Sequence, residues 1–318
     1  MGDHSYYLNE KDEFVIENYN QQKPFSSFLP AVSGLYGKPL WAYYVNRGQC
    51  IASFGVNNKD YSIMEFQPAN KSYRLTALQG FRTFYKVKRE GAVQFYEPFR
   101  DTRLSGARET GQKMRITSYD FKLEDNNEAL GLRTEVSFCT LAEEEIPGLV
   151  RTVHVENTKD TPVTVEALDG LVSLIPYYLT NKDMKDESNL KQAWMSADLE
   201  DGLPFYRIKA LPYDTAETVL LQGGNFYLNY CEEGGNIVYS AMITDPTLIF
   251  GNMTDFSVPV EFYGPHFNIP KEQVSAGYTP CAFGYREITL MGGCGCTFYT
   301  LVGSAPGLER YQSFWRKR

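Results

Sequence analysis

Residues 112–141 read QKMRITSYDFKLEDNNEALGLRTEVSFCTL, and their side-chain pattern decides the fold class. Met114 and Ile116 fall on one face of an extended chain and Arg115 falls on the other, because successive side chains of a strand point to opposite faces. The run at 125–127, Asp-Asn-Asn, consists of turn-forming residues, and the alternation resumes after it. This period of two around a central turn predicts an antiparallel hairpin.

The same design recurs at 148–176, GLVRTVHVENTKDTPVTVEALDGLVSLIP. Val153 and Val155 alternate with His154, the polar stretch that follows reverses the chain, and Pro162 opens a second strand, where its missing N–H is tolerated. A second hairpin is therefore predicted. Further strands are predicted at 61–68, 72–87, 92–99, 205–211, 218–222, 225–231, 237–243 and 285–302.

Many strands without alternating helices indicate antiparallel sheets packed face to face. The aromatic content of 14%, with 23 Tyr and 20 Phe, suits strands. We predict an all-β fold: one large antiparallel β-sandwich over 25–305, after an N-terminal extension at 1–24. No break in composition divides the chain.

Only two segments have a helical pattern. Residues 181–198 are polar with scattered apolar residues, which indicates a loop or a short helix. Leu308, Tyr311, Phe314 and Trp315 follow helical spacing and form one apolar stripe. No helix-ending signal follows them, so we expect an exposed stripe on a helix that continues into a further segment.

Composition excludes several kinds of partner. With a net charge of −8 at pH 7, the chain has no basic field for nucleic acid or an anionic membrane. No apolar run approaches the roughly 20 residues that cross a bilayer. Residues 1–25 lack the pattern of a secretory signal, so we expect a cytoplasmic protein whose six cysteines remain thiols packed in the core.

Catalytic and metal-binding motifs are weak. The chain has no Gly-x-Ser-x-Gly motif and only three histidines. His154 lies mid-strand, where a structural role is favoured, and His266 lies in a Gly/Pro-rich loop, where a functional role stays open. Cys294 and Cys296 lack a second pair of ligands for zinc. No phosphate loop or dinucleotide motif is present, so we expect no cofactor and no metal.

The carboxylates divide into clustered and isolated ones. The runs at 143–145 and 124–125 are typical of solvated turns. Asp60, Glu65 and Glu97 are isolated beside aromatic residues and are better candidates for acid–base chemistry. The sequence alone does not pair any two of them, so we assign no catalytic residue.

A polar cluster stands between two aromatic and apolar runs in WAYYVNRGQCIASFG, residues 41–55. Asn46 and Gly48 tolerate positive φ, so the cluster predicts a turn between strands. Amides and charges among aromatic rings, continuing to residue 74, are also what a surface facing a sugar requires, and a polar sheet edge remains the alternative. The predicted sugar-facing side chains are Trp41, Tyr44, Arg47, Gln49, Asn57, Asp60 and Arg82.

Three segments resemble one enzyme family. Residues 28–86, from FLPAVSGLYGKPLWAYYVNRG to LTALQGFRTFYK, resemble the start of the 1,2-β-oligoglucan phosphorylases of glycoside hydrolase family 94. Residues 150–176 are similar to a strand, Asn-containing turn and Pro-led strand in the N-terminal domain of that family. Residues 279–305, with Pro-Cys before a strand and a Gly-containing turn, are similar to its closing segment.

The resemblance implies a β-supersandwich of the galactose-mutarotase type, followed by linker helices and an (α/α)6 barrel. In that family the barrel carries the general acid and the phosphate site, and inorganic phosphate, the co-substrate, attacks the anomeric carbon with inversion. Residues 306–318 then begin a linker helix. The implied partners are a β-glucan oligosaccharide and the catalytic barrel of the same parent chain.

The chain is therefore expected to be a non-catalytic N-terminal module. Two alternatives stay open. One is an enzyme similar to aldose 1-epimerase that uses His266 or His154 with an isolated Glu, and the other is a free-standing carbohydrate-binding module.

Overall fold

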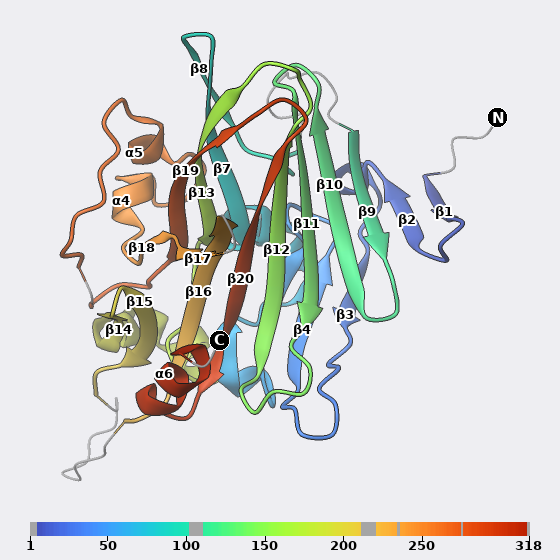
Figure 1. The fold of residues 1–318 in the computed structure, drawn as a ribbon. Helices are drawn as coiled ribbons and strands as arrows, with labels where there is room; N and C mark the ends of the chain where they lie inside the picture. Colours follow the sequence, from blue (N-terminus) through green and yellow to red (C-terminus); the bar gives the residue numbers. More distant parts are fainter. Residues whose placement is uncertain (1–4, 102–110, 211–220, 234–235, 275, 317–318) are drawn as a thin grey trace.

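The computed structural model describes residues 5–101, 111–210, 221–233, 236–274 and 276–316, and strands dominate these ranges (Figure 1). The strands form three antiparallel sheets. Across the largest sheet they are ordered β1 (Tyr6–Leu8), β2 (Phe14–Glu17), β9 (Gly111–Ile116), β10 (Asp120–Asn127), β11 (Leu132–Thr140), β12 (Gly148–Asn157), β20 (Gly295–Ala305), β16 (Gly224–Glu233), β15 (Leu203–Ile208) and β14 (Met195–Glu200), with β17 (Asn236–Tyr239) paired to β16.

Two smaller sheets cover one face of this large sheet. The first is ordered β18 (Ala241–Ile243), β19 (Ala282–Leu290), β13 (Val163–Leu171), β7 (Phe81–Arg89) and β8 (Ala92–Tyr96). The second is ordered β3 (Ser26–Leu29), β4 (Leu40–Val45), β5 (Ile51–Val56) and β6 (Ser62–Met64). The described helices are α1 (Ala69–Gln79), α2 (Asn181–Asp186), α3 (Ser188–Lys191), α4 (Thr247–Phe250), α5 (Val260–Tyr263) and α6 (Leu308–Arg316), with 3-10 turns at Tyr19–Gln21, Lys59–Tyr61 and Gln192–Trp194.

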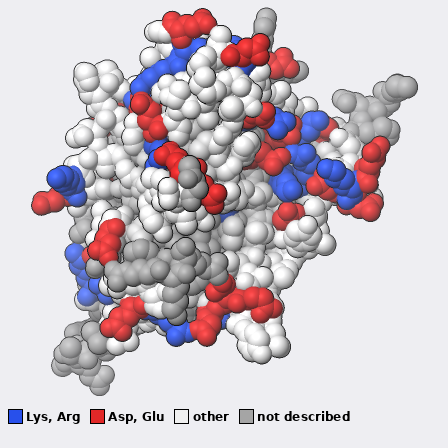
Figure 2. Space-filling view, in the orientation of Figure 1, with Lys and Arg blue, Asp and Glu red and all other residues white. Residues whose placement is uncertain are grey.

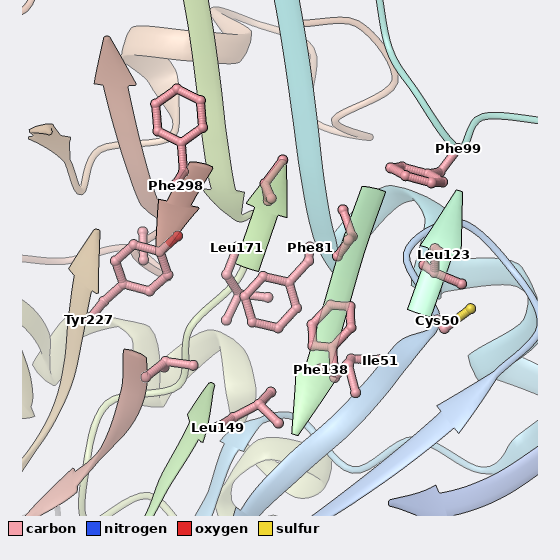
Figure 3. Packing of buried hydrophobic residues seen from close by; sticks show 14 of the residues in the cluster. Cys50, Ile51, Phe81, Phe99, Leu123, Phe138, Leu149, Leu171, Tyr227 and Phe298 are labelled. Carbon is pink, nitrogen blue, oxygen red and sulfur yellow. The ribbon is translucent and has the colours of Figure 1, made fainter. Parts of the chain in front are cut away.

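The core lies between the layers. The ring of Phe138 on β11 packs 5.5 Å from Phe81 on β7, and the ring of Phe121 on β10 packs 4.8 Å from Tyr44 on β4. Figure 3 shows Phe81 and Phe138 facing one another within this cluster. Rings from opposed sheets thus meet in the interior, and the prediction of a large antiparallel β-sandwich is confirmed.

The stretch that opened the sequence analysis forms three strands and not two. The backbone N–H of Thr117 donates to Asp120 at 2.9 Å and turns the chain between β9 and β10. The second turn lies between Asn127, where β10 ends, and Leu132, where β11 begins, and Gly131 in this turn has φ +67°. The predicted turn at 125–127 is therefore wrong, because these residues belong to β10. Asp125 is buried and accepts the backbone N–H of Phe99 at 2.9 Å, which keeps it inside the strand.

Strands β12 and β13 are not a hairpin. β12 pairs with β11 and β20 in the large sheet, whereas β13 pairs with β7 and β19 in the five-stranded sheet. The predicted alternation of Val153 and Val155 with His154 is correct, because the two valines are fully buried and His154 is half-buried. The turn between these strands therefore crosses the sandwich from one layer to the other.

Helix α1 occupies part of a predicted strand. Its first turn forms because the carbonyl of Pro68 accepts the backbone N–H groups of Lys71 and Ser72 at 2.9 and 3.0 Å. The helix ends at Gly80, where a Cβ would lie 2.6 Å from the carbonyl oxygen of Thr76. The strand predicted at 72–87 is wrong for residues 72–79, which belong to α1. It is correct from Phe81 onward, where β7 begins.

Both ends of the described chain join the sandwich. Strand β2 pairs with β9, and Ile16 is fully buried, so residues 6–17 extend the large sheet and do not form a separate extension. The helix predicted at 308–318 is confirmed as α6. Tyr311 is not exposed as expected: it is fully buried, with its ring 4.8 Å from that of Phe226.

Some predicted features lie partly outside the described residues. The side chains of Phe314 and Trp315 lie outside the described residues, as does most of the strand predicted at 218–222. Residues 181–198 form α2, α3, a 3-10 turn and the start of β14. Cys50, Cys231 and Cys281 are buried thiols, but Cys294 is exposed and does not pack in the core. No helix in the described part of the chain is long and apolar enough to cross a membrane.

Candidate functional site

A hollow lies between helix α1 and strands β5 and β6. Its enclosed volume is about 20 Å³, room for about one water molecule, and beyond that it opens to solvent. It combines apolar side chains with a carboxyl group, amides and hydroxyls, which is the mixture found in small-molecule sites. The lining residues are Ala52, Met64, Glu65, Gln67, Ser72, Leu75, Thr76, Gln79 and Ser173. We call this the Glu65 hollow.

The local sequence explains how α1 lines the hollow. Ser72 and Thr76 are one helical turn apart and are its buried residues. The hydroxyl of Ser72 donates to the carbonyl of Gln67 at 3.2 Å, and that of Thr76 donates to the carbonyl of Ser72 at 2.7 Å. The Ser72 bond ties the helix to the segment that enters it from β6, whereas the Thr76 bond lies within the helix.

Glu65 is the titratable group of this site. Burial raises the pKa of its carboxyl above the ordinary value, while the Gln67 side chain and the positive charges of Lys185 and Lys71 oppose that rise. A carboxyl with a raised pKa keeps its proton to higher pH, and it can then donate one hydrogen bond and accept others. Such a group suits a ligand rich in hydroxyls.

Aromatic rings stand next to the hollow. Phe66 lies between two lining residues in the chain, and its ring meets that of Trp41 edge to face at 5.9 Å. The ammonium group of Lys185 lies 5.8 Å from the centre of the Phe66 ring. The indole N–H of Trp41 donates to the carbonyl of Asn58 at 3.2 Å, which fixes the ring on the outer face of the sheet, at the edge of the hollow.

Three of the predicted sugar-facing residues lie at this edge. Trp41 is half-buried and packs on Phe66. Asn57 is exposed at φ +60° in the turn after β5, and Asp60 accepts the backbone N–H of Asn181 at 3.2 Å. The structure thus brings these residues together near the Glu65 hollow without placing them in its lining.

Arg47 occupies the predicted turn between β4 and β5. Its guanidinium group donates to the carbonyls of Asn46 and Gln22 at 2.6 and 3.1 Å and lies 5.8 Å from the centre of the Tyr73 ring on α1. The turn itself is confirmed: Gly48 has φ +54°, and a Cβ there would lie 2.9 Å from the Cα of Ala77. Arg47 joins the turn to the helix.

Tyr44 and Gln49 are buried, which corrects their predicted place on a surface. Tyr44 is 4% exposed and packs on Phe121, because its face of β4 points into the core. Gln49 accepts from the guanidinium group of Arg151 at 2.6 Å and donates to the hydroxyl of Thr83 at 2.9 Å. Tyr44 therefore does not face solvent, and Gln49, which lines the second hollow described below, is already bonded to Arg151 and Thr83.

Arg82 is also buried, because it forms an internal ion pair. Its guanidinium group donates to both oxygens of Glu97 at 2.7 and 2.9 Å, and their side chains are only 3% and 9% exposed. It also donates to the backbone carbonyls of Phe256 and Ser257. Arg82 therefore holds the loop after α4 against β7, and the isolated acid Glu97 neutralises its charge.

A second hollow, with an enclosed volume of about 50 Å³, lies beside this ion pair. Residues of α1 line it from the other side, and Arg100 lies 3.6 Å from Glu97. Its lining residues are Gly48, Gln49, Ala77, Leu78, Phe81, Arg82, Glu97, Pro98, Phe99 and Arg100. Because its charged groups pair with one another, it offers a ligand less than the Glu65 hollow does.

The two candidate histidines are apart in the fold. His154 lies on β12 with its Nδ1 2.8 Å from the hydroxyl of Thr297, and His266 is exposed in the loop after α5. Neither lines the Glu65 hollow. Within the described ranges, no three His, Cys, Asp or Glu side chains are grouped to hold a metal ion.

Sequence reasoning missed the part of the site that α1 and Ser173 supply. Ser72 and Gln79 lie within the strand predicted at 72–87, and Ser173 follows a strand with no motif around it. One signal was present. Pro68 followed by Ala69, with Leu75, Ala77 and Leu78 among good helix formers, marks a helix start.

Comparisons with known proteins complete the description. No family model matches the chain, and no curated protein matches it. Among solved structures it is similar to a polysaccharide lyase (TM-score 0.46, 9% identity, 87% of this chain and 34% of that chain). It is also similar to a candidate aldose 1-epimerase from Escherichia coli K12, with a TM-score of 0.40 and 9% identity over 89% of this chain and 99% of that chain. A third similar structure is a candidate kojibiose phosphorylase from the human microbiome, with a TM-score of 0.34 and 8% identity over 96% of this chain and 28% of that chain.

The chain spans about a third of the length of the lyase and 28% of that of the phosphorylase. At these scores the likenesses carry no argument about function.

Proposed function

We propose that this chain is a non-catalytic, carbohydrate-binding β-sandwich module of an inverting β-glucan phosphorylase of the 1,2-β-oligoglucan type. In this proposal it works beside a catalytic (α/α)6 barrel of the same parent chain, which binds the inorganic phosphate. The observation that supports binding is the Glu65 hollow, where a protonatable carboxyl, amides and hydroxyls converge. The observation that supports the family is the resemblance of residues 28–86.

The lining of the hollow suits a sugar. The side chains of Gln67 and Gln79 each offer donors and an acceptor, and the hydroxyl of Ser173 offers both. Sugar hydroxyls need this mixture because each is donor and acceptor at once. Met64 and Leu75 supply apolar contact for the faces of a sugar ring.

The same lining lacks the pair of groups that glycosidic chemistry requires. Glu65 is the single carboxyl among the described lining residues, whereas inverting enzymes place an acid opposite the attacking group. The resemblance assigns the general acid and the phosphate site to the barrel. Binding without turnover is therefore the function that we propose for this chain alone.

Isothermal calorimetry with sophorotetraose tests the proposal. We expect measurable heat with the wild-type chain and roughly a three- to tenfold loss of affinity in Gln67→Ala, since one hydrogen bond is removed. Gln222→Ala, at an exposed position outside the lining of the hollow, is the matched control and should bind as the wild type does. Absence of heat, or equal affinity in both variants, would contradict the proposal.

Turnover assays test the non-catalytic part. The chain with sophorotetraose and phosphate should release no glucose 1-phosphate. It should also leave the rate of α/β-glucose interconversion, followed by proton NMR, unchanged. Either activity would replace this proposal with an enzymatic one, the second in favour of the epimerase alternative.

A further inference from the structure

The large sheet has a second face, which points away from the core. Opposed residues of neighbouring antiparallel strands share a face. One face of the sheet therefore runs across β11, β12, β20 and β16 through three opposed pairs: Ser137 and Thr152, Thr152 and Tyr299, and Tyr299 and Tyr230. All four side chains are half-buried, while the intervening residues such as Val153 are fully buried. Helix α6 covers this face at Phe226 and Leu228 of β16, which cluster with Tyr311, and we call the part beside it the open face.

Tyrosine rings gather on the open face. The rings of Tyr230 and Tyr299 stack at 5.3 Å with an interplanar angle of 21°, and Tyr239 on β17 meets Tyr230 edge to face at 6.1 Å. Tyr239 is 39% exposed. These three residues form what we call the tyrosine platform. Its rings are held by strand register, so presenting them costs little conformational entropy.

Hydrogen-bonding groups border the platform on one side. The hydroxyls of Ser137 and Thr152 lie 2.6 Å apart, and the Nδ1 of His154 lies 2.8 Å from the hydroxyl of Thr297. Next to the imidazole is Gly295, where a Cβ would lie 2.6 Å from the ring carbon Cε1 of His154. The missing side chain leaves the imidazole room to lie along the sheet.

Most charges on the flank of this border are paired. Glu135 on β11 shares Arg115 with Glu124 on β10, at 2.7 and 2.9 Å, and Glu156 on β12 pairs with Arg133 at 2.9 Å. Figure 2 shows charged side chains of both signs gathered toward β9 and β10, to the right of this face. Because two carboxylates share Arg115, and the exposed Glu232 follows Tyr230 by two residues, a ligand over the tyrosine platform meets a slight excess of negative charge, which favours a neutral partner over an anionic one.

We propose that the tyrosine platform is a second saccharide-binding site, which takes a neutral oligosaccharide. The apolar faces of its sugar rings would stack on Tyr230 and Tyr299, and its hydroxyls would bond to Thr152, Thr297 and His154. The site goes beyond the proposed function, because the large sheet and the core separate it from the smaller sheets that hold the Glu65 hollow.

NMR of the full chain labelled with ¹³C-tyrosine tests the proposal. Single Tyr→Phe changes assign the resonances of Tyr230, Tyr239 and Tyr299. Titration with sophorohexaose and, separately, cellohexaose should shift the Tyr230 and Tyr299 signals, whereas those of Tyr119, an exposed residue in the turn after β9, should stay in place. Tyr299→Ala should lower the affinity roughly three- to tenfold, and Tyr299→Phe should retain most of it.

Each result bears on the proposal separately from the Glu65 hollow. Shifts that persist in Gln67→Ala support the tyrosine platform even if the hollow binds nothing. Binding that Gln67→Ala abolishes, with unmoved platform signals, overturns the platform and leaves the proposed function standing. Platform signals that move with protein concentration and not with sugar would overturn it in favour of contact between two copies of the chain. If Tyr299→Ala fails to fold, the ring shifts in the wild-type chain still decide.

Discussion

The cluster around Arg151 and the Glu65 hollow both place polar groups inside the sandwich, and they differ in where their partners come from. Arg151 is fully buried and donates to both oxygens of Asp169 at 2.6 and 2.8 Å, as well as to Gln49 and Thr83. Of its nitrogens only Nε has no partner among the described residues. Glu65 is only half-buried and faces open space.

The difference separates structure from function. A buried ion pair within the chain helps to hold the layers in one arrangement. Any other arrangement would separate the pair and leave an uncompensated buried charge. A polar group beside open space retains hydrogen-bonding capacity for a ligand. The first kind of site should respond to mutation in stability, and the second in affinity.

The largest expected effect is at Asp169. Asp169→Ala would leave Arg151 charged and unpaired, and we expect it to lower the free energy of unfolding by about 3–5 kcal/mol. Urea denaturation measures this loss. The control is Asp198→Ala, because its pair with Arg207 is about a third exposed on each side and should be worth at most about 1 kcal/mol. Equal losses in the two variants would show that burial of the Arg151 pair does not matter.

The next comparison is within one strand. Tyr44 points into the core and Trp41 to the outer face of the sheet, so Tyr44→Ala should destabilise by about 3–5 kcal/mol and Trp41→Ala by clearly less. Thermal unfolding followed by circular dichroism gives the order. If Trp41→Ala is the more destabilising change, the strand faces the other way and the outer face is part of the core.

A smaller effect concerns pH. The folded-state pKa of Glu65 is raised above its ordinary 4.5, so the native chain holds this proton more tightly than the unfolded chain. The resulting stability is complete below pH 4.5 and is lost as pH rises through the folded pKa. Glu65→Gln cannot titrate, so the stability of the wild type relative to Glu65→Gln should fall across this window. Melting temperatures measured from pH 4 upward test this, and a constant difference would contradict the raised pKa.

Local patterns predicted much of the fold. The alternation at 150–155 predicted which side chains face inward, since strand periodicity is set by the backbone alone. The turn at Gly48 follows from the tolerance of glycine for positive φ, whereas Asn46, expected on the same ground, does not adopt positive φ. The helical spacing at the C-terminus predicted α6.

Strand pairing and the burial of polar residues depend on tertiary contacts that local sequence patterns do not show. Strand pairing depends on contacts far along the chain, so β12 and β13 looked like a hairpin and belong to different sheets. Gln49 and Arg82 looked like surface residues because their partners, Arg151 and Glu97, are distant in sequence. Glu65 was singled out as an isolated acid, but its environment depends on α1, which the pattern did not predict.

The central claim is that the Glu65 hollow binds saccharide, and the ionisation of Glu65 tests it most directly. The ¹³C shift of the Glu65 carboxyl, followed against pH with and without saturating sophorotetraose, gives its pKa in both states. We predict a pKa above the ordinary value in the free chain and a further change when the sugar is bound, because a ligand replaces solvent beside the carboxyl. A curve that is the same with and without the sugar, while the chain binds it, would place the sugar elsewhere and contradict the claim.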